Sequence, residues 1–142
     1  MNILVSACLL GLACRYDGKS KPCEDVIKLT EKYNLIPFCP EVMGGLATPR
    51  HPSEIVGDRV INLIDEDVTA QYKKGAEEAL KIAKMYNCKY AILKEKSPSC
   101  GSGIIHNGKF DGGYIDGDGI TARLLKENRI KVLGESDINN FK

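Results

Sequence analysis

Residues 3–8, Ile-Leu-Val-Ser-Ala-Cys, are the first apolar segment of the chain. The part from 3 to 7 contains branched side chains and shows no polar–apolar alternation, which is typical of a strand buried on both faces. Strands of this kind belong to parallel sheets that are covered by helices on either side. The segment therefore predicts a central strand of an α/β fold, and this strand ends at Cys8.

Short apolar segments of the same kind recur along the chain and alternate with helical patterns. Further strands are predicted over residues 35–38, 90–93 and 130–133. Apolar side chains at helical spacing follow Glu24, Asp67 and Asp118. Asp118 is expected to open the last helix, and Asn128 to close it in the left-handed conformation. Alternating strands and helices predict one Rossmann-like α/β domain over residues 1–142, with a mostly parallel sheet flanked by helices.

Two small accessory hairpins are expected outside this sheet. Residues 55–61, Ile-Val-Gly-Asp-Arg-Val-Ile, place a turn sequence between two pairs of branched side chains, which predicts the first hairpin. The pair Asn107-Gly108 lies between residues 104–106 and 109–110. This pair favours a two-residue type I′ turn and predicts the second hairpin.

The composition indicates a folded protein that acts on small molecules. The chain has 142 residues, of which 43% are hydrophobic and 27% charged, as in a domain with an ordinary core. Its 20 basic and 19 acidic side chains are interleaved, so neither a nucleic-acid patch nor a membrane-binding surface stands out. The first residues carry no basic leader, and no apolar run reaches transmembrane length. We expect a cytoplasmic protein without a membrane partner, and the oligomeric state stays open.

Three of the six cysteines are predicted to meet at one site. Without an export signal, cysteines are better interpreted as thiols, metal ligands or catalytic groups than as disulfides. Cys8, Cys39 and Cys100 fall at or after the carboxyl ends of three predicted parallel strands, which meet at one edge of the sheet. Thiolates prefer soft metal centres, but cysteine also occurs as a small core residue, the interpretation that we favour for Cys23 and Cys88.

The spacing of the cysteines does not identify a metal, because it matches neither the ferredoxin runs nor a zinc knuckle. Three functions are therefore open: an iron–sulfur enzyme, a structural or regulatory zinc module, and a metal-free thiol-based sulfur or redox enzyme. A structural zinc ion requires a fourth ligand besides the three cysteines, and a metal-free enzyme requires one cysteine of low pKa. Cys14 follows Cys8 closely enough to reach the same pocket.

A series of short motifs extends over essentially the whole chain. They are Ser6-Ala7-Cys8-Leu9-Leu10-Gly11, Cys14-Arg15-Tyr16-Asp17-Gly18, Cys39-Pro40-Glu41-Val42-Met43-Gly44-Gly45-Leu46, Pro49-Arg50, Asp67-Val68-Thr69, Gly75-Ala76, Leu93-Lys94 and Ser97-Pro98-Ser99-Cys100-Gly101. Together these motifs resemble the family labelled domain of unknown function 523, which includes thiouracil desulfidase.

The resemblance implies an iron–sulfur-dependent enzyme that removes sulfur from a small thiolated nucleobase or nucleotide of the thiouracil type. It implies a 4Fe-4S cluster bound by Cys8, Cys39 and Cys100, whose open iron captures the substrate sulfur before water replaces it without net redox chemistry. It further implies that Glu41 is the acid–base carboxylate and that Ser97 lies close to the substrate. The family pattern does not need a cysteine at position 14.

Overall fold

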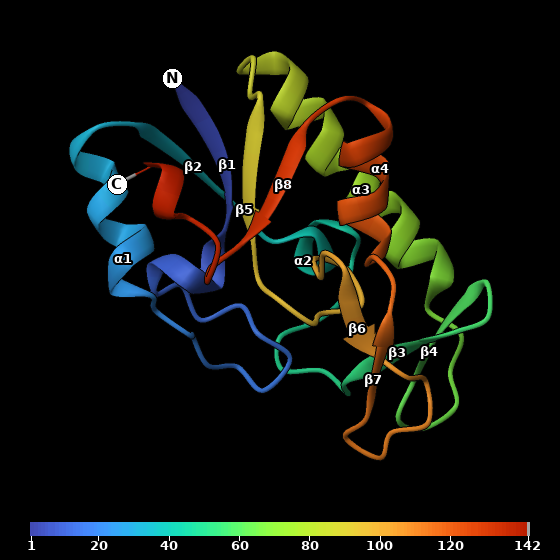
Figure 1. Ribbon diagram of the computed structural model, residues 1–142. Coiled ribbons are helices and arrows are strands. Elements are labelled where there is room, and N and C mark those ends of the chain that lie inside the picture. The colour runs from blue at the N-terminus through green and yellow to red at the C-terminus, as the bar shows by residue number, and fades with distance from the viewer. Residues whose placement is uncertain (142) are drawn as a thin grey trace.

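The computed structural model describes residues 1–141 and is built around a four-stranded sheet (Figure 1). The strands lie side by side in the order β2 (Asn34–Phe38), β1 (Asn2–Ser6), β5 (Tyr90–Leu93) and β8 (Lys131–Gly134). All neighbouring pairs in this sheet are parallel. The predicted α/β fold with a mostly parallel sheet is therefore confirmed.

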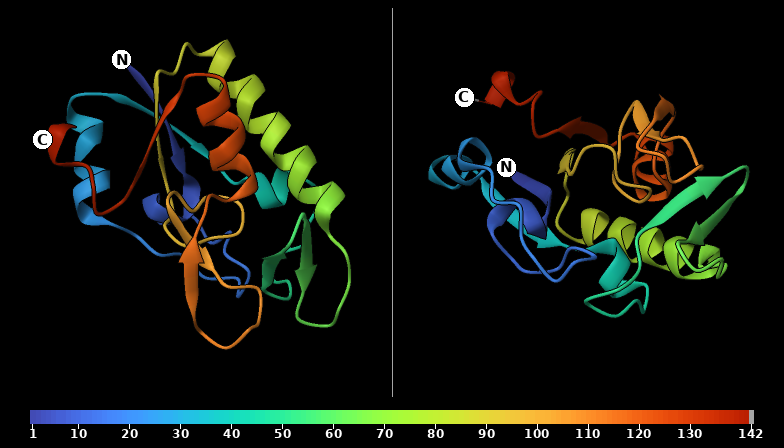
Figure 2. Two further views of the ribbon diagram at one scale, coloured as in Figure 1. Left: turned by 45° about the vertical axis from the view of Figure 1, so that its right-hand side comes forward. Right: turned by 90° about the horizontal axis from the view of Figure 1, so that it is seen from below.

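Helices cover both faces of the sheet (Figures 1 and 2). The α-helices are α1 (Glu24–Ile27), α2 (Pro40–Met43), α3 (Thr69–Met85) and α4 (Ile120–Glu127), and the 3-10 turns are η1 (Ala7–Leu10), η2 (Lys28–Glu31) and η3 (Asn139–Phe141). Ile3 packs with α1 on one face, and Leu4 packs with α3 and α4 on the other. None of the helices in residues 1–141 is long and apolar enough to cross a membrane.

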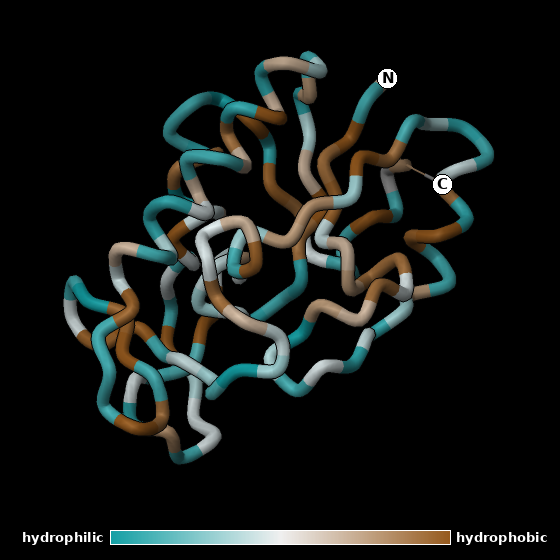
Figure 3. The backbone as a smooth tube through the Cα atoms, turned by 180° about the vertical axis from the view of Figure 1, so that it is seen from behind, coloured by the Kyte–Doolittle hydropathy of each residue, from teal (hydrophilic) through white to brown (hydrophobic). Residues whose placement is uncertain are grey.

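The apolar sequence of β1 follows from this arrangement, because successive side chains of a strand point to opposite faces. Ile3, Leu4 and Val5 are all buried, although they lie on alternating sides of the sheet. Figure 3 shows hydrophobic residues along the central strands, while the loops at the periphery are largely hydrophilic. Neither face of this part of β1 is exposed to solvent, so apolar residues are favoured on both faces.

The direction in which strands are added to the sheet reverses between β1 and β5. From β1 the chain adds β2 on one side, and it then crosses over to add β5 and β8 on the other side. The loops that leave the carboxyl ends of β1 and β5 therefore diverge. In open α/β sheets such a switch point is where ligands bind.

Two antiparallel hairpins lie outside the sheet. β3 (Ser53–Val56) and β4 (Arg59–Asn62) form the first, as predicted. β6 (Ile104–His106) pairs with β7 (Tyr114–Asp116), so a hairpin is present, but the predicted two-residue turn at Asn107-Gly108 is wrong. Residues 107–113 form a wide loop instead.

Tertiary contacts explain why this turn does not form. The side-chain oxygen of Asn107 accepts the N–H of Lys109 at 2.9 Å. The buried carboxylate of Glu54 accepts the N–H groups of Gly108 and Phe110 at 2.9 and 3.2 Å. The N–H groups of Gly108 and Phe110 are therefore hydrogen-bonded to Glu54 of β3. The strand that pairs with β6 begins only at residue 114.

The predicted ends of α4 differ in part from the observed ones. The carboxylate of Asp118 accepts the N–H of Gly103 and a hydrogen bond from Lys126, both at 2.8 Å, and it does not cap the helix. Arg129 takes the left-handed conformation (φ 64°), whereas Asn128 does not (φ −102°). Asn128 thus closes the helix as predicted, with its side-chain N–H donating to the backbone oxygen of Leu124 at 2.9 Å, but the left-handed conformation falls on the next residue.

Helix α2 follows β2 and crosses α3 at close range. A Cβ atom at Gly44 would collide with the backbone oxygen of Gln71, and one at Gly75 would collide with the backbone oxygen of Pro40. Only glycine at these two positions allows the backbones of α2 and α3 to approach this closely. The contact therefore fixes the beginning of α2 against α3.

We expect Gly75→Ala to destabilise the protein, although alanine favours a helix over glycine by about 1 kcal/mol. The added methyl group collides with Pro40, and overpacking of this kind costs about 1–3 kcal/mol. Urea unfolding should give a lower free energy of unfolding than for the wild type. Lys74→Ala, at an exposed position of the same helix, is the control and should change this value little. An increased free energy of unfolding in Gly75→Ala would contradict a rigid crossing.

Candidate active site

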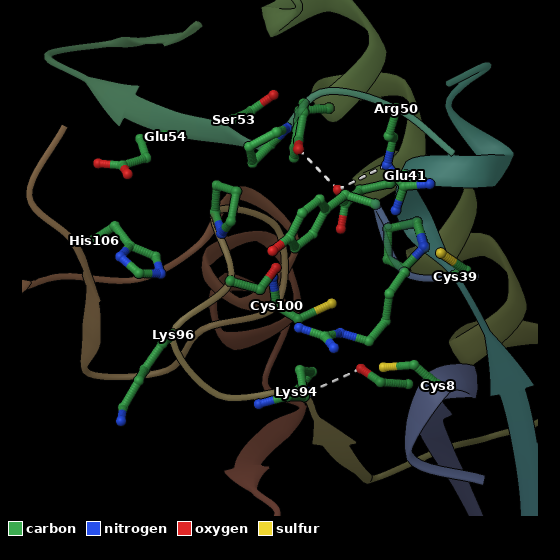
Figure 4. A pocket seen from close by; sticks show the side chains of 18 of the residues that line it. Cys8, Cys39, Glu41, Arg50, Ser53, Glu54, Lys94, Lys96, Cys100 and His106 are labelled. Atoms are coloured by element: carbon green, nitrogen blue, oxygen red, sulfur yellow. Dashed lines mark hydrogen bonds and ion pairs between the residues drawn. The ribbon is translucent and has the colours of Figure 1, made fainter. Parts of the chain in front are cut away.

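A cavity of about 510 Å³ opens at the carboxyl ends of β1, β2 and β5. Its lining includes all five residues that the sequence singled out: Cys8, Cys39, Glu41, Ser97 and Cys100. In Figure 4 the three cysteine side chains point toward a common space. Segments that are far apart in the sequence therefore meet at the predicted edge of the sheet.

A different element positions each of these thiols. Cys8 is buried in η1, directly beyond β1. Cys39 lies between β2 and α2, and its Sγ donates to the backbone oxygen of Cys14 at 3.7 Å. Cys100 is buried in the loop that follows β5. The three thiols are thus attached to the three strands that surround the switch point.

Ser97 shapes the turn that carries Cys100. Its Oγ accepts the N–H groups of Ser99 and Cys100, each at 3.1 Å. Its backbone oxygen accepts the N–H of Gly101 at 2.9 Å. Within residues 1–141, no group accepts a hydrogen bond from the Ser97 hydroxyl. Ser97 therefore orders the loop, and its O–H is still free to donate to a molecule in the cavity.

Burial and neighbouring groups raise the pKa of the Cys39 and Cys100 thiols and keep these two protonated. Burial raises the pKa of Cys100 to about 12; a hydrogen bond with Ser6 lowers it, and the charges of Glu41 and Cys39 raise it further. The hydrogen bond with Cys14, together with burial, raises the pKa of Cys39 far above its usual range. A cationic metal centre overcomes the raised pKa values, because it binds thiolates and displaces their protons. The donor set therefore suits a soft metal centre.

Cys14 is a further thiol in the lining of the cavity. Its backbone oxygen accepts a hydrogen bond from the Sγ of Cys39 at 3.7 Å, so it lies next to one of the predicted ligands. The hydrogen bond with Cys39 lowers its pKa, but the hydrogen bond with Cys8 and burial outweigh this effect, so the pKa is raised. Cys23 and Cys88 lie outside the lining and pack on opposite faces of the sheet, as expected of core residues.

Glu41, in the first turn of α2, faces the cavity and is held by two hydrogen bonds. Its Oε2 accepts the hydroxyl of Tyr72 at 2.8 Å and the Nε of Arg50 at 3.3 Å. The side chains of Arg50 and Glu41 are 7% and 16% exposed, so the ion pair is largely shielded from water. Oε1 receives no hydrogen bond from the described residues. One carboxylate oxygen is thus fixed, and the other is free to bind water or substrate.

Sequence reasoning did not predict the roles of Tyr72 and Arg50. Tyr72 matches the apolar stripe of α3, and burial together with the charge of Glu41 raises its pKa, so it stays a donor. Arg50 also donates to the backbone oxygen of Cys14 at 3.0 Å. It thereby links the loop after η1 to the carboxylate of α2. Both contacts join distant segments, and no local pattern in the sequence indicates them.

The two hairpins form the other end of the cavity, where Figure 4 shows Glu54 and His106 away from Cys8 and Cys39. Glu54 holds loop 107–113 in place, and Phe110 of this loop contributes to the lining. In the described part of the chain, Nδ1 of His106 is the one buried side-chain nitrogen or oxygen without a hydrogen-bond partner. His106 thus lines this end of the cavity, although its Nδ1 is covered by protein.

The sequence model of the 2-thiouracil desulfurase family matches residues 3–137. The chain belongs to this family. The resemblance found in the sequence motifs is thereby confirmed, and the match extends over the whole sheet and all the cavity-lining cysteines.

Two other proteins, one compared by sequence and one by structure, are similar to this chain over nearly their full lengths. Uncharacterized protein YbbK of Bacillus subtilis (strain 168) is 43% identical to this chain over an alignment of 149 residues. The alignment, gaps included, covers 98% of this chain and 99% of that protein. A solved structure described as the 4Fe-4S-dependent thiouracil desulfidase TudS has a TM-score of 0.90 and 44% identity. The similarity covers 99% of this chain and 94% of the TudS chain.

Glu54→Ala should release loop 107–113, because it leaves the N–H groups of Gly108 and Phe110 without their acceptor. Loss of a buried hydrogen-bond partner costs about 1–3 kcal/mol. Hydrogen–deuterium exchange of the peptide that contains the loop should be faster than in the wild type, with exchange in β1 unchanged. Glu54→Gln keeps an acceptor oxygen and should retain slow exchange. If Glu54→Ala exchanges as slowly as the wild type, other contacts hold the loop.

Proposed function

We propose that the protein removes sulfur from a small thiolated pyrimidine of the thiouracil type, as the free base or a nucleotide. The site lies in one domain over residues 1–142, where Cys8, Cys39 and Cys100 hold a 4Fe-4S cluster. The observation that carries the proposal is that three thiols from the ends of neighbouring strands share a cavity with Glu41. The family membership and the similarity to TudS support both the substrate class and the cofactor.

The donor arrangement favours a cluster over a single zinc ion. Within the described residues, no three His, Cys, Asp or Glu side chains lie close enough together to surround one metal ion. In an iron–sulfur cluster each cysteine binds a different iron, so the ligands lie further apart than they do around one ion. Three thiols that share one cavity without surrounding a single point therefore favour a cluster over one zinc ion.

A metal-free thiol enzyme is also less well supported. Such an enzyme needs a cysteine of lowered pKa as its nucleophile. The pKa values of Cys14, Cys39 and Cys100 are all raised, mainly by burial and by hydrogen bonds between thiols. These thiols suit metal ligation better than nucleophilic attack.

The reaction exchanges sulfur for oxygen at one carbon: the C=S group and water give C=O and hydrogen sulfide, and no electrons are transferred. When bound, the cluster supplies an iron with an open coordination position that takes up the sulfur. Tyr72 and Arg50 hold Oε2 of Glu41, so Oε1 is oriented to take a proton from the attacking water. The carboxyl group then returns this proton to the departing sulfur.

Ser97 and the far end of the cavity bind and orient the pyrimidine. The Ser97 hydroxyl donates one hydrogen bond, and the loop that it orders keeps Cys100 in place. His106 and Phe110 line the far end of the cavity and form a wall for the ring. Polar groups of fixed direction in a mostly apolar cavity are typical of sites for small molecules.

Replacing Cys8, Cys39 or Cys100 singly by Ser should abolish stable cluster binding, because each thiol holds a different iron. Cys23→Ala and Cys88→Ala are matched controls outside the cavity and should retain the cluster. The measurement is the iron and acid-labile sulfide content after anaerobic reconstitution. Protein that contains stoichiometric zinc, or that desulfurises thiouracil without iron, would contradict the proposal.

Glu41→Gln should keep the full iron content and lower turnover of thiouracil by about 10²- to 10⁴-fold, the usual contribution of general acid–base catalysis. Ser97→Ala should lower turnover per bound iron less, since its hydrogen bond to the substrate contributes about 1 kcal/mol; the loss of the acceptor for the N–H groups of Ser99 and Cys100 is monitored by the iron content. Turnover and iron content are measured on the same anaerobic preparations. Near-normal turnover of fully loaded Glu41→Gln would remove Glu41 from the chemistry.

A further inference from the structure

The cavity contains one thiol more than the proposed cluster needs. Cys14 lines the same space as Cys8, Cys39 and Cys100, and its backbone oxygen accepts a hydrogen bond from the Sγ of Cys39 at 3.7 Å. A thiol this close to metal-binding thiols is in a position to bind the same centre. The structure therefore raises the question of what the extra thiol does.

Cys14 differs from the other three cysteines in how the fold holds it. Cys8 and Cys100 are buried, and Cys39 joins a strand to a helix. Cys14 is half-buried and lies in the segment between η1 and α1, which contains no regular helix or strand. Its side chain is therefore less buried than those of Cys8 and Cys100.

The main chain of Cys14 is nevertheless well anchored. Its N–H donates to the backbone oxygen of Leu12 at 2.9 Å, and its own backbone oxygen accepts Nη2 of Arg50 at 3.0 Å. The thiol can consequently turn about one side-chain bond while the backbone stays in place. Rotamer changes of this kind are fast compared with typical catalytic turnover.

We propose that Cys14 is an exchangeable ligand, whose thiolate occupies the open iron in the resting enzyme and gives way to the sulfur of the substrate. The inference rests on the proposed function. On binding iron the thiol releases its proton to solvent, and on displacement the thiolate takes a proton up again, so no electrons are transferred. The exchange closes the reactive iron to water and oxygen until substrate arrives. It also raises the apparent Kd of the substrate, which equals the intrinsic Kd divided by the open fraction of the enzyme.

The first test measures alkylation of Cys14 by iodoacetamide under anaerobic conditions, with peptide mapping by mass spectrometry. An iron-bound thiolate is not available as a nucleophile, so Cys14 should react about tenfold more slowly in the cluster-loaded protein than in the iron-free protein. Added 4-thiouracil should restore the rate. Cys23, which is also half-buried but lies outside the cavity, is the internal control and should react equally in all samples.

The second test uses Cys14→Ala, with Cys23→Ala as the matched control. Cys14→Ala should keep its iron, show an altered electron paramagnetic resonance spectrum of the reduced cluster without substrate, and bind 4-thiouracil about tenfold more tightly if about nine-tenths of the resting enzyme is closed. An unchanged spectrum and affinity, or equal alkylation of loaded and iron-free protein, would overturn the role of Cys14 and leave the proposed function intact. Complete loss of iron would make Cys14 a permanent ligand and overturn its exchange. Wild-type protein that binds no iron would overturn both proposals.

Discussion

The parallel pairing of β1 with β2 on one side and β5 on the other is the constraint on which the site depends. Ser6 pairs with Phe38 and Val5 with Ile92, so the strands end at nearly the same level. A shift of one residue would turn every side chain of β1 to the opposite face, and burial on both faces opposes this. The register therefore determines both the core and the place at which the cysteines meet.

A second set of contacts brings the carboxylate to the thiols. Gly44 and Gly75 allow α2 to approach α3 closely, and this approach places Glu41 within reach of Tyr72. Arg50 connects the same carboxylate to the backbone of Cys14. Glu41, the backbone of Cys14 and the thiol of Cys39 therefore belong to one hydrogen-bonded unit, in which each member restricts the position of the next.

The sequence predicted the sheet and the meeting of the cysteines because burial on two faces leaves a clear apolar pattern, and parallel strands leave their carboxyl ends at one edge. It could not predict the wide loop at Asn107, since the acceptor that opens this loop is Glu54, far away in the chain. The contacts of Tyr72 and Arg50 were missed for the same reason. The assignment of Glu41 and Ser97 came from the family motifs, because their residue types alone also suit ordinary loop positions.

The two ends of the cavity are built by different parts of the chain. The thiols follow strands of the central sheet, whereas His106 and Phe110 belong to a hairpin that β3 holds through Glu54. Mutations in the hairpin can therefore alter the shape and polarity of one wall of the cavity while the end that contains the thiols stays intact. In an evolving family this separation lets substrate preference diverge while the desulfuration chemistry is retained.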